Sequence, residues 1–451
     1  MWSDRCSSEE LEKLVAALRE ATPLRPEAEG PFMRALESAA SPVEVAAALE
    51  SRPGFVWLDS PGSHKIFHTP LLTLTSQANA FDLIEAACKA WEGIPGAILC
   101  GYLGYELGSE AEGLRSVPGP LPDLHLALYD QYMVWDSEGW LLAGTDAWRD
   151  ISVPDSFPEA ATGAPFPPVP EPTATPTDEA FLRAVERTIR RIHEGEIYQV
   201  NLCRKLETTL PPECVWPLYL RLRDISPADH GAFLRIDKDT AILSTSPELF
   251  LRVEDGEVRS YPIKGTRPRG ATEEGDEALR LDLTNSEKDR AELAMIVDVT
   301  RNDLGRVCQP GSVRVGSHAE LITLPTLHHT VSKVVGQLRT DATLADLLRA
   351  TCPPASISGA PKIHAMEVAA EEEGFRRGPC MGSIGWLSLD GRMELSVAIR
   401  TAVAAEGKVH YLAGCGITAE SDPQAELAES EAKAAAFRRA LSGSGPETSA
   451  R

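Results

Sequence analysis

The sequence predicts a mixed α/β fold, because strand-like runs occupy the first third of the chain and helices alternate with strands after it. The early runs are Phe55–Leu58, Ala97–Leu99 and Leu126–Val134. Of the 451 residues, 43% are hydrophobic and 25% are charged, which are ordinary proportions for a globular protein and exclude disorder of the whole chain. The length accommodates about three domains of ~150 residues, or one or two larger ones.

The charge balance narrows the class of partner. The chain has 44 Lys and Arg against 67 Asp and Glu, a formal net charge of −23. This acidity argues against nucleic acid or an anionic membrane as a partner, whereas an anionic small substrate needs only a local cationic pocket. No run approaches 18 apolar residues and the N-terminus has no apolar signal core, so we expect no membrane span and a cytoplasmic location. The nine cysteines are widely spaced without a CxxC pair, which favours free buried thiols over zinc or disulfides.

Proline content divides the chain. Residues 154–176 hold eight prolines and are expected to form a linker or an extended surface segment. Residues 1–153 form an N-terminal part, residues 177–441 a second part, and residues 442–451 a disordered tail.

Helical periodicity and turn residues predict the elements of the second part. Phe181, Val185, Ile189 and Ile192 form an apolar stripe at helical spacing in the segment Asp178–Glu194, which Gly195 ends. A strand over Ile197–Leu202 follows. Two further helices are expected at Ser286–Leu304 and at Pro423–Leu441, where the proline suits the first turn.

Two of these helices carry paired acids. Asp289 and Glu292 are three residues apart on one helix, and Glu426 and Glu429 are three apart on the other, so each pair shares a helix face. Four carboxylates on two facing helices suit a hard cation such as Mg²⁺. In a chain with 67 acids, however, such pairs are more often a solvated face.

Turns and isolated charges give weaker signals. The turns Ser356–Lys362 (SISGAPK) and Ala413–Thr418 (AGCGIT) present backbone N–H groups that suit a carboxylate, or are plain turns. Glu248 and Lys264 lie between apolar strands. A buried Glu must be neutral or paired, and a buried Lys can act as a nucleophile. Local pattern does not separate these roles from an ordinary surface location.

Taken together and in order, the motifs resemble those of the chorismate-utilising enzymes. They are SPELF, PIKGT, NSEKDRAELAMIVDVTRNDLGRV, LHHTVS, SISGAPK, GSIGW, AIRT, GCGIT and QAELAESEAK. The likeness is strong over Asp178–Leu441 and weaker before it. Within the family it is greatest to component I of the aminodeoxychorismate synthases, and component I of the anthranilate synthases is the close relative.

The resemblance implies two large antiparallel sheets packed face to face with helices outside, an α+β arrangement to which the N-terminal part contributes strands. It implies Mg²⁺ held by Glu292 and Glu429, with Asp289 and Glu426 in support. It also implies that Arg400 and backbone N–H groups near Gly414 and Gly416 meet a carboxylate of chorismate. Further substrate contacts are implied for Lys433, His329 (rather than His328), Ser358 and Thr266.

The resemblance also implies the chemistry. The C4 hydroxide of chorismate leaves poorly, so it needs a proton donor, and Glu248 matches the family's general acid. An attacking amine must be neutral, so Lys264 must lose its proton before it attacks C2. Relatives that add water have Lys where this chain has Gln199, and relatives that make anthranilate typically read PIAGT. PIKGT therefore suggests that ammonia adds at C4 to give 4-amino-4-deoxychorismate for 4-aminobenzoate and folate supply.

Alternative functions and departures from the family pattern stay open. The chain shows no Cys nucleophile elbow with a glutaminase triad, so ammonia is expected from a separate glutamine amidotransferase subunit or from free ammonium. Anthranilate synthesis is the first alternative, and a non-catalytic subunit that binds chorismate or tryptophan is the second. Pro354 and Ala355 replace the family's Gly-Gly, and Trp386 replaces a Tyr, which would weaken a carboxylate contact or alter the substrate. Glu37 and Ser38 in ALESA resemble part of a tryptophan site, or mark a helix end.

Overall fold

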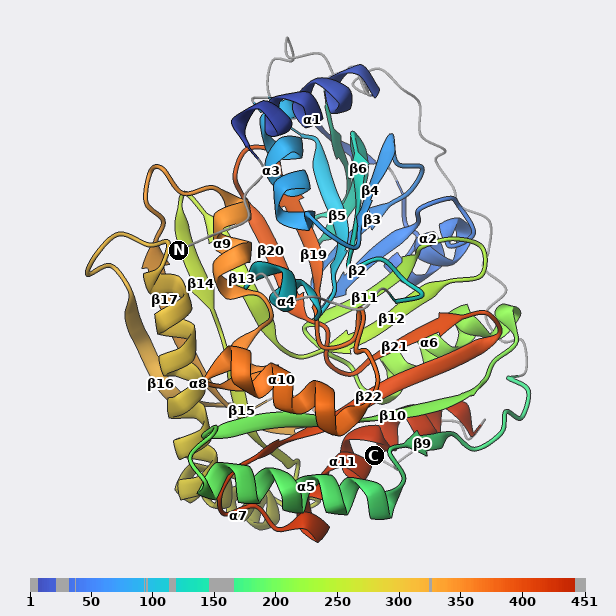
Figure 1. The fold of residues 1–451 in the computed structure, drawn as a ribbon. Coiled ribbons are helices and arrows are strands. Elements are labelled where there is room, and N and C mark those ends of the chain that lie inside the picture. Colours follow the sequence, from blue (N-terminus) through green and yellow to red (C-terminus); the bar gives the residue numbers. More distant parts are fainter. Residues whose placement is uncertain are drawn as a thin grey trace.

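The computed structural model describes residues 7–21, 32–36, 38–92, 94, 96–112, 119–145, 166–323 and 327–442. Two large antiparallel sheets dominate the fold, with helices around them (Figure 1). The helices are α1 (Ser8–Ala21), α2 (Pro42–Leu49), α3 (Ala80–Ala90), α4 (Leu107–Ala111), α5 (Asp178–His193), α6 (Val215–Ile225), α7 (Glu273–Asn285), α8 (Glu287–Gly305), α9 (Leu344–Thr351), α10 (Lys362–Glu373) and α11 (Pro423–Leu441).

The larger sheet has 12 strands in the described residues. In spatial order they are β1 (Phe32–Leu36), β8 (Gly139–Gly144), β7 (Gln131–Asp136), β3 (Ser63–Phe67), β2 (Val56–Ser60), β11 (His230–Arg235), β12 (Ala241–Ser246), β21 (Thr401–Ala405), β22 (Lys408–Ile417), β10 (Gln199–Thr209) and β18 (Gly359–Ala360), with β9 (Thr173–Thr175) paired to β10.

The smaller sheet has 10 strands in the same described ranges. In spatial order they are β15 (Ile263–Pro268), β17 (Leu327–Gln337), β14 (Glu257–Ser260), β13 (Leu249–Glu254), β20 (Met393–Val397), β19 (Ser383–Ser388), β5 (Ile98–Leu103), β6 (Leu124–Tyr129) and β4 (Leu72–Ser76), with β16 (Arg314–Thr323) paired to β17. Strands from the N-terminal part therefore lie in both sheets. The expected pair of large antiparallel sheets is confirmed.

Period-two alternation explains how the larger sheet is covered on both faces. Ile242 of β12 and Val403 of β21 join the core shared with the smaller sheet. Their neighbours Leu243 and Ala402 point the other way and pack with residues of α6 and α11. Since successive strand residues face opposite sides, one strand supplies both cores.

The strand-like run Leu126–Val134 is not one strand. Its first half is β6 in the smaller sheet and its second half is β7 in the larger sheet. The chain changes sheets at the buried Asp130, whose carbonyl accepts a hydrogen bond from Thr145 N at 2.8 Å. β6 is buried along most of its length, whereas Met133 is the only buried residue of β7.

The predicted helices of the second part are confirmed. The helix expected at Asp178–Glu194 is α5, and Phe181 and Val185 of its stripe are buried. The helix at Pro423–Leu441 is α11 with the same bounds, begun by an Asp422 side chain that accepts from Ala425 N. Figure 1 shows α5 and α11 at the end of the molecule where β10 and β22 lie, opposite α1 and α3.

The Pro-rich segment is described only from residue 166, and residues 146–165 and the expected tail at 443–451 lie outside the described residues. From there it follows the edge of the larger sheet: Phe166 and Val169 pack against a core cluster, and β9 pairs with β10. This half is part of the fold rather than a free linker.

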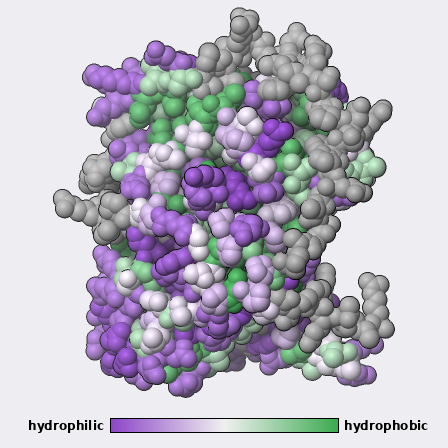
Figure 2. Space-filling view, turned by 90° about the vertical axis from the view of Figure 1, so that its right-hand side faces the viewer, coloured by the Kyte–Doolittle hydropathy of each residue, from purple (hydrophilic) through white to green (hydrophobic). Residues whose placement is uncertain are grey.

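The described surface is mostly hydrophilic on the face drawn in Figure 2, as the proportion of charged residues leads one to expect. Smaller hydrophobic patches lie between the hydrophilic side chains. No described helix is both long and apolar enough to cross a membrane. The eight cysteines within the described ranges are free thiols, and all except Cys88 are buried.

Candidate active site

Gly416 of β22 marks the point at which three of the expected site residues meet. A Cβ built on Gly416 would lie 2.5 Å from Gln199 Nε2 and 3.5 Å from both Lys264 Nζ and Glu292 Oε2. Gln199 begins β10, Lys264 lies on β15 of the other sheet, and Glu292 lies on α8. A side chain at position 416 would displace the Gln199 amide, so glycine leaves the junction of the two sheets open.

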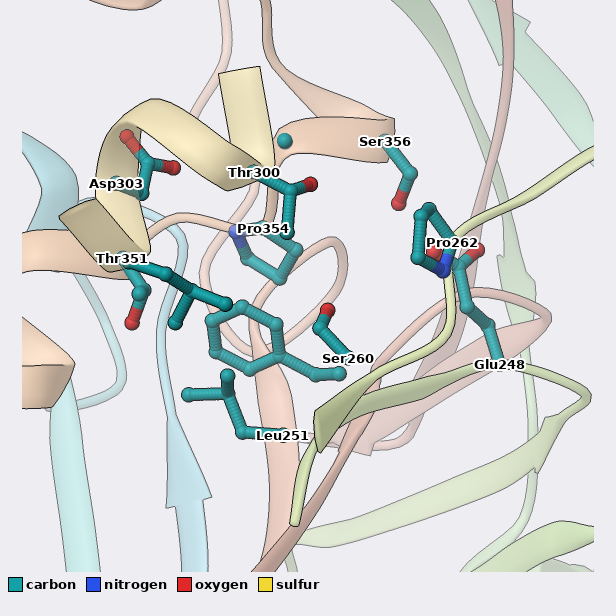
Figure 3. A pocket seen from close by; sticks show the side chains of 12 residues that line it. Glu248, Leu251, Ser260, Pro262, Thr300, Asp303, Thr351, Pro354 and Ser356 are labelled. Carbon is teal, nitrogen blue, oxygen red and sulfur yellow. The ribbon is translucent and has the colours of Figure 1, made fainter. Parts of the chain in front are cut away.

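Glu248 lies between β12 and β13, on the wall of a pocket that Ser356, Thr300 and Asp303 also line (Figure 3). Burial raises the pKa of Glu248 to about 7, against the opposing effects of the Ser356 hydroxyl and the Lys264 ammonium. The carboxyl is therefore partly protonated near neutral pH, as a proton donor requires. Pro354, which departs from the family pattern, also lines this pocket together with Ala355.

Four carboxylates come from α8 and α11, the two helices predicted to carry them. Glu426 is 1% exposed; its Oε1 accepts from Ser421 Oγ at 2.7 Å, while its buried Oε2 has no hydrogen-bond partner in the described residues. Asp289 accepts from Arg267 at 3.3 Å. Burial raises the pKa of Glu292, although the ammonium groups of Lys264 and Lys288 oppose it.

Glu429 is surrounded by cations. Lys433 Nζ lies 2.7 Å from Glu429 Oε1 and also donates to the carbonyl of Gly414 at 2.8 Å. Burial alone would raise the pKa of Glu429, but Lys433, Lys264 and Lys288 together hold it below its usual value. Glu429 is therefore ionised at neutral pH, the form in which a carboxylate binds a metal ion.

The residues fit a hard cation. The orphaned Glu426 oxygen and an ionised Glu429 supply the oxygen donors that Mg²⁺ prefers. The Cys415 sulfur lies within 4.8 Å of ligand oxygens of both residues. Burial raises the pKa of its thiol far above neutral, so a protonated sulfur, which is a poor ligand for Mg²⁺, faces this corner.

Arg400 is the cation best placed for an anionic ligand. Its guanidinium forms no hydrogen bond or ion pair with any residue of the described ranges, and burial lowers its pKa from the usual value. β21 pairs with β22 only as far as Ala402 and Tyr411, so the next residues of β22 pair with β10 alone among the described strands. Two residues before Ala402, Arg400 approaches the β22 edge that contains Gly414 and Gly416. No β21 residue pairs with this edge, although the Gly414 carbonyl accepts from Lys433.

The two neighbouring histidines differ. His328 Nε2 lies 2.8 Å from Asp276 and its Nδ1 lies 3.0 Å from Thr323 Oγ1, so both ring nitrogens are used. His329 Nδ1 lies 2.8 Å from Thr266 Oγ1, while its buried Nε2 has no partner in the described residues. Burial and the Arg400 charge lower the pKa of His329 to about 4, which leaves a neutral ring with a free polar atom.

Ser358 is buried in the turn before β18. Its carbonyl accepts from Asn201 N at 2.8 Å and its hydroxyl donates to Ala355 O at 3.3 Å. The SISGAPK turn is thereby tied to β10, two residues after Gln199. Pro361 is the N-cap residue of α10, which begins at Lys362.

Two expected positions lie away from this cluster. Ser38 follows β1 at one edge of the larger sheet, whereas β10 and β22 lie near the other edge. Residues 32–36 form a strand, so ALESA does not mark a helix end, and Glu37 lies outside the described residues. The Trp386 ring faces Lys65 of β3, with Nζ 5.5 Å from the ring centroid.

Sequence reasoning missed three residues: Lys288, Ser356 and Arg377. Lys288 lies between the acid pairs, Ser356 beside Glu248, and Arg377 beneath the SISGAPK turn. The first two stand inside recognised motifs, so their position in the motif was a usable signal. Only the spacing of Arg377 from Glu373 was a local signal, because its other partners, Ile357 and Asn201, come from distant segments.

The chain is similar to known proteins over most of its length. The family model described as chorismate binding enzyme matches residues 55–439. An aminodeoxychorismate synthase component 1 from Klebsiella aerogenes is 39% identical over 340 residues, which cover 73% of this chain and 74% of that protein. An aminodeoxychorismate synthase from Streptomyces griseus is 36% identical over 92% of this chain, which spans 60% of that relative's length.

A solved structure supports the fold. The anthranilate synthase component I of Streptococcus pneumoniae has a TM-score of 0.70 at 28% identity, covering 86% of this chain and 91% of that one. The resemblance inferred from the motifs is confirmed by the family match and the relatives. This chain therefore belongs to the chorismate binding enzyme family.

Proposed function

We propose that this chain is the chorismate-aminating component of an aminodeoxychorismate synthase, which converts chorismate and ammonia to 4-amino-4-deoxychorismate and water. The observation that carries the proposal is the convergence of Lys264, Glu292 and Gln199 on Gly416. A lysine amine, an acid near its protonation midpoint and a set of carboxylates are the groups that amination at C4 needs. The relatives named as aminodeoxychorismate synthases support the same reaction.

Substrate binding follows from the unpartnered groups. The Arg400 guanidinium and the free edge of β22 would hold one carboxylate of the chorismate dianion. The neutral His329 ring offers its Nε2 to the same ligand. Glu292 and Glu429, supported by Asp289 and Glu426, would hold a Mg²⁺ ion that draws electron density from the ring carboxylate.

The reaction would proceed through a covalent adduct with Lys264. Lys264 Nζ bonds to C2 while the C4–O bond breaks, and Glu248 gives its proton to the departing hydroxide, which leaves as water. Ammonia bonds to C4 while the C2–N bond to Lys264 breaks. The proton that the new amine loses restores Glu248. Gln199 cannot act as a base, so this site does not activate water in place of ammonia.

The partner follows from the chemistry of ammonia supply. We infer that a separate glutamine amidotransferase subunit delivers ammonia, as the component numbering of the relatives suggests. A 4-aminobenzoate and folate route would consume the product. A cytoplasmic location would suit both the amidotransferase subunit and the folate route.

Product analysis tests the proposal. The purified chain is incubated with chorismate, Mg²⁺ and ammonium at alkaline pH, and the product is identified by mass and ultraviolet spectrum. Aminodeoxychorismate, which a lyase converts to 4-aminobenzoate, is the expected product. Anthranilate would replace the proposal with its closest alternative, and absence of any turnover would favour a regulatory subunit.

A further inference from the structure

Lys288 is a cation already placed among the acids of the proposed metal site. Its Nζ lies 3.2 Å from Glu426 Oε1 on α11 and 3.9 Å from Glu292 Oε1 on its own helix, α8. It therefore links the two acid-bearing helices. The Lys288 ammonium offsets negative charge that would otherwise push the two helices apart.

The Lys288 ammonium neutralises Glu426 without satisfying both of its carboxylate oxygens. Lys288 reaches only one oxygen of Glu426, and the buried Oε2 has no partner in the described residues. A buried carboxylate oxygen without a partner is costly, and a divalent cation at this corner would satisfy it. The Lys288 side chain is 44% exposed, so its flexible stem can swing into solvent.

Lys288 differs in this respect from the neighbouring lysine on α11. Lys433 binds Glu429 and is also anchored by the carbonyl of Gly414. Within the described residues, Lys288 has only the carboxylates of Glu292 and Glu426 as ion-pair partners. An ammonium and a divalent cation cannot both occupy the space between Glu292 and Glu426.

We propose that Lys288 is an exchangeable counter-ion: it neutralises Glu292 and Glu426 when no metal is bound, and it withdraws when Mg²⁺ enters. Lys288 thereby sets the apparent affinity for Mg²⁺, because each binding event must displace it. This inference rests on the proposed function in requiring Mg²⁺ at these acids.

The test uses uncharged and charged replacements in the full chain. Lys288→Met and Lys288→Gln remove the charge, and Lys288→Arg retains it. Arg301→Gln is the matched control, because Arg301 forms an exposed i,i+3 pair with Asp298 on the same helix. Titration calorimetry with MgCl₂ alone, without chorismate, measures affinity, and thermal unfolding in EDTA and in excess MgCl₂ measures stability.

We expect both uncharged variants to bind Mg²⁺ at least about threefold more tightly than the unaltered chain, since the competing charge is gone. They should also unfold at lower temperature in EDTA and gain more from Mg²⁺. Lys288→Arg and Arg301→Gln should bind as the unaltered chain does.

Two outcomes would overturn the inference in different ways. Mg²⁺ binding with equal or weaker affinity in the uncharged variants would refute the role of Lys288 and leave the metal site standing. Absence of Mg²⁺ binding in the unaltered chain and in every variant would refute the metal site itself, and the counter-ion role with it.

Discussion

Arg377 and Glu373 form a buried ion pair, with Nη2 2.5 Å from Oε1, next to the backbone of the candidate site. The other Arg377 N–H groups donate to the carbonyls of Ile357 and Asn201, at 2.9 and 2.6 Å. Glu373 accepts in turn from Cys203 N at 2.7 Å. One side-chain pair therefore fixes the SISGAPK turn relative to the strand that begins with Gln199.

Removing one partner of this pair should be costly. Arg377→Met leaves the Glu373 charge buried and unpaired, so we expect the free energy of unfolding to fall by ~3–5 kcal/mol. Urea denaturation measures the change. Arg187→Met, which breaks a half-exposed pair with Glu372, should cost less than ~1 kcal/mol. Combining Arg377→Met with Glu373→Leu should recover part of the loss, and equal losses in Arg377→Met and Arg187→Met would refute the structural role.

Lys264→Ala should remove the covalent route. Without the Nζ nucleophile we expect kcat for amination to fall by at least ~10³-fold, because nucleophile and acid act as one unit. Steady-state assays at saturating chorismate and ammonium measure it. Lys408→Ala, in an exposed pair with Glu207, is the control and should leave kcat unchanged. Unaltered amination kinetics in Lys264→Ala would refute the nucleophile assignment.

Glu248 should impose an upper pH limit on activity. Its pKa is raised to about 7, so the protonated acid is lost above that pH and kcat should decline. The concentration of unprotonated ammonia must be held constant across the pH series, since it otherwise rises with pH. Glu248→Gln should be much slower, and its kcat should not decline above a pH of about 7. A decline that persists in Glu248→Gln would assign the pH dependence to another group.

The same carboxyl should make stability depend on pH. Because its folded pKa is above the unfolded value of ~4.3, the folded chain binds more protons between the two values. The stabilisation is fully present below pH ~4.3 and is lost as pH rises through about 7, a change of up to ~4 kcal/mol. Denaturation of the unaltered chain and Glu248→Gln across this window should differ in slope; parallel curves would contradict the shift.

The proposed metal ligands should act through Mg²⁺. Glu292→Gln and Glu429→Gln each remove an anionic oxygen, so we expect the Mg²⁺ concentration for half-maximal activity to rise by at least ~10-fold. Activity titrations with MgCl₂ measure it. Glu287→Gln, at the exposed start of α8, is the control. Unaltered titrations in both ligand variants would refute the assignment.

Gln199 tests the choice of nucleophile. It is 2% exposed, and its Oε1 has no partner in the described residues. Gln199→Lys places a base where relatives that add water have one, so a hydroxylated chorismate isomer should form beside the aminated product. Mass spectrometry without ammonium detects it, and its absence would count against this role for position 199.

The sequence by itself determined the family, the helices that carry the acids and the spacing that puts each pair on one helix face. The bounds of α11 follow from Pro423 and apolar periodicity, which are local properties, and the order of the motifs identifies the family. The sequence could not predict that Glu426 Oε2 and His329 Nε2 lack hydrogen-bond partners in the described residues. Whether a buried atom has a partner depends on all of its neighbours in space.

Only the tertiary structure decided how the segments meet. It divided Leu126–Val134 between two sheets, brought Lys264 and Gln199 from different sheets to Gly416, and placed Lys288 between acids on two helices. It also fixed the Arg377–Glu373 support, whose bonds reach segments up to 176 residues away. Periodicity reports which face of an element is buried, but partners are chosen by long-range packing and charge balance, which no local pattern encodes.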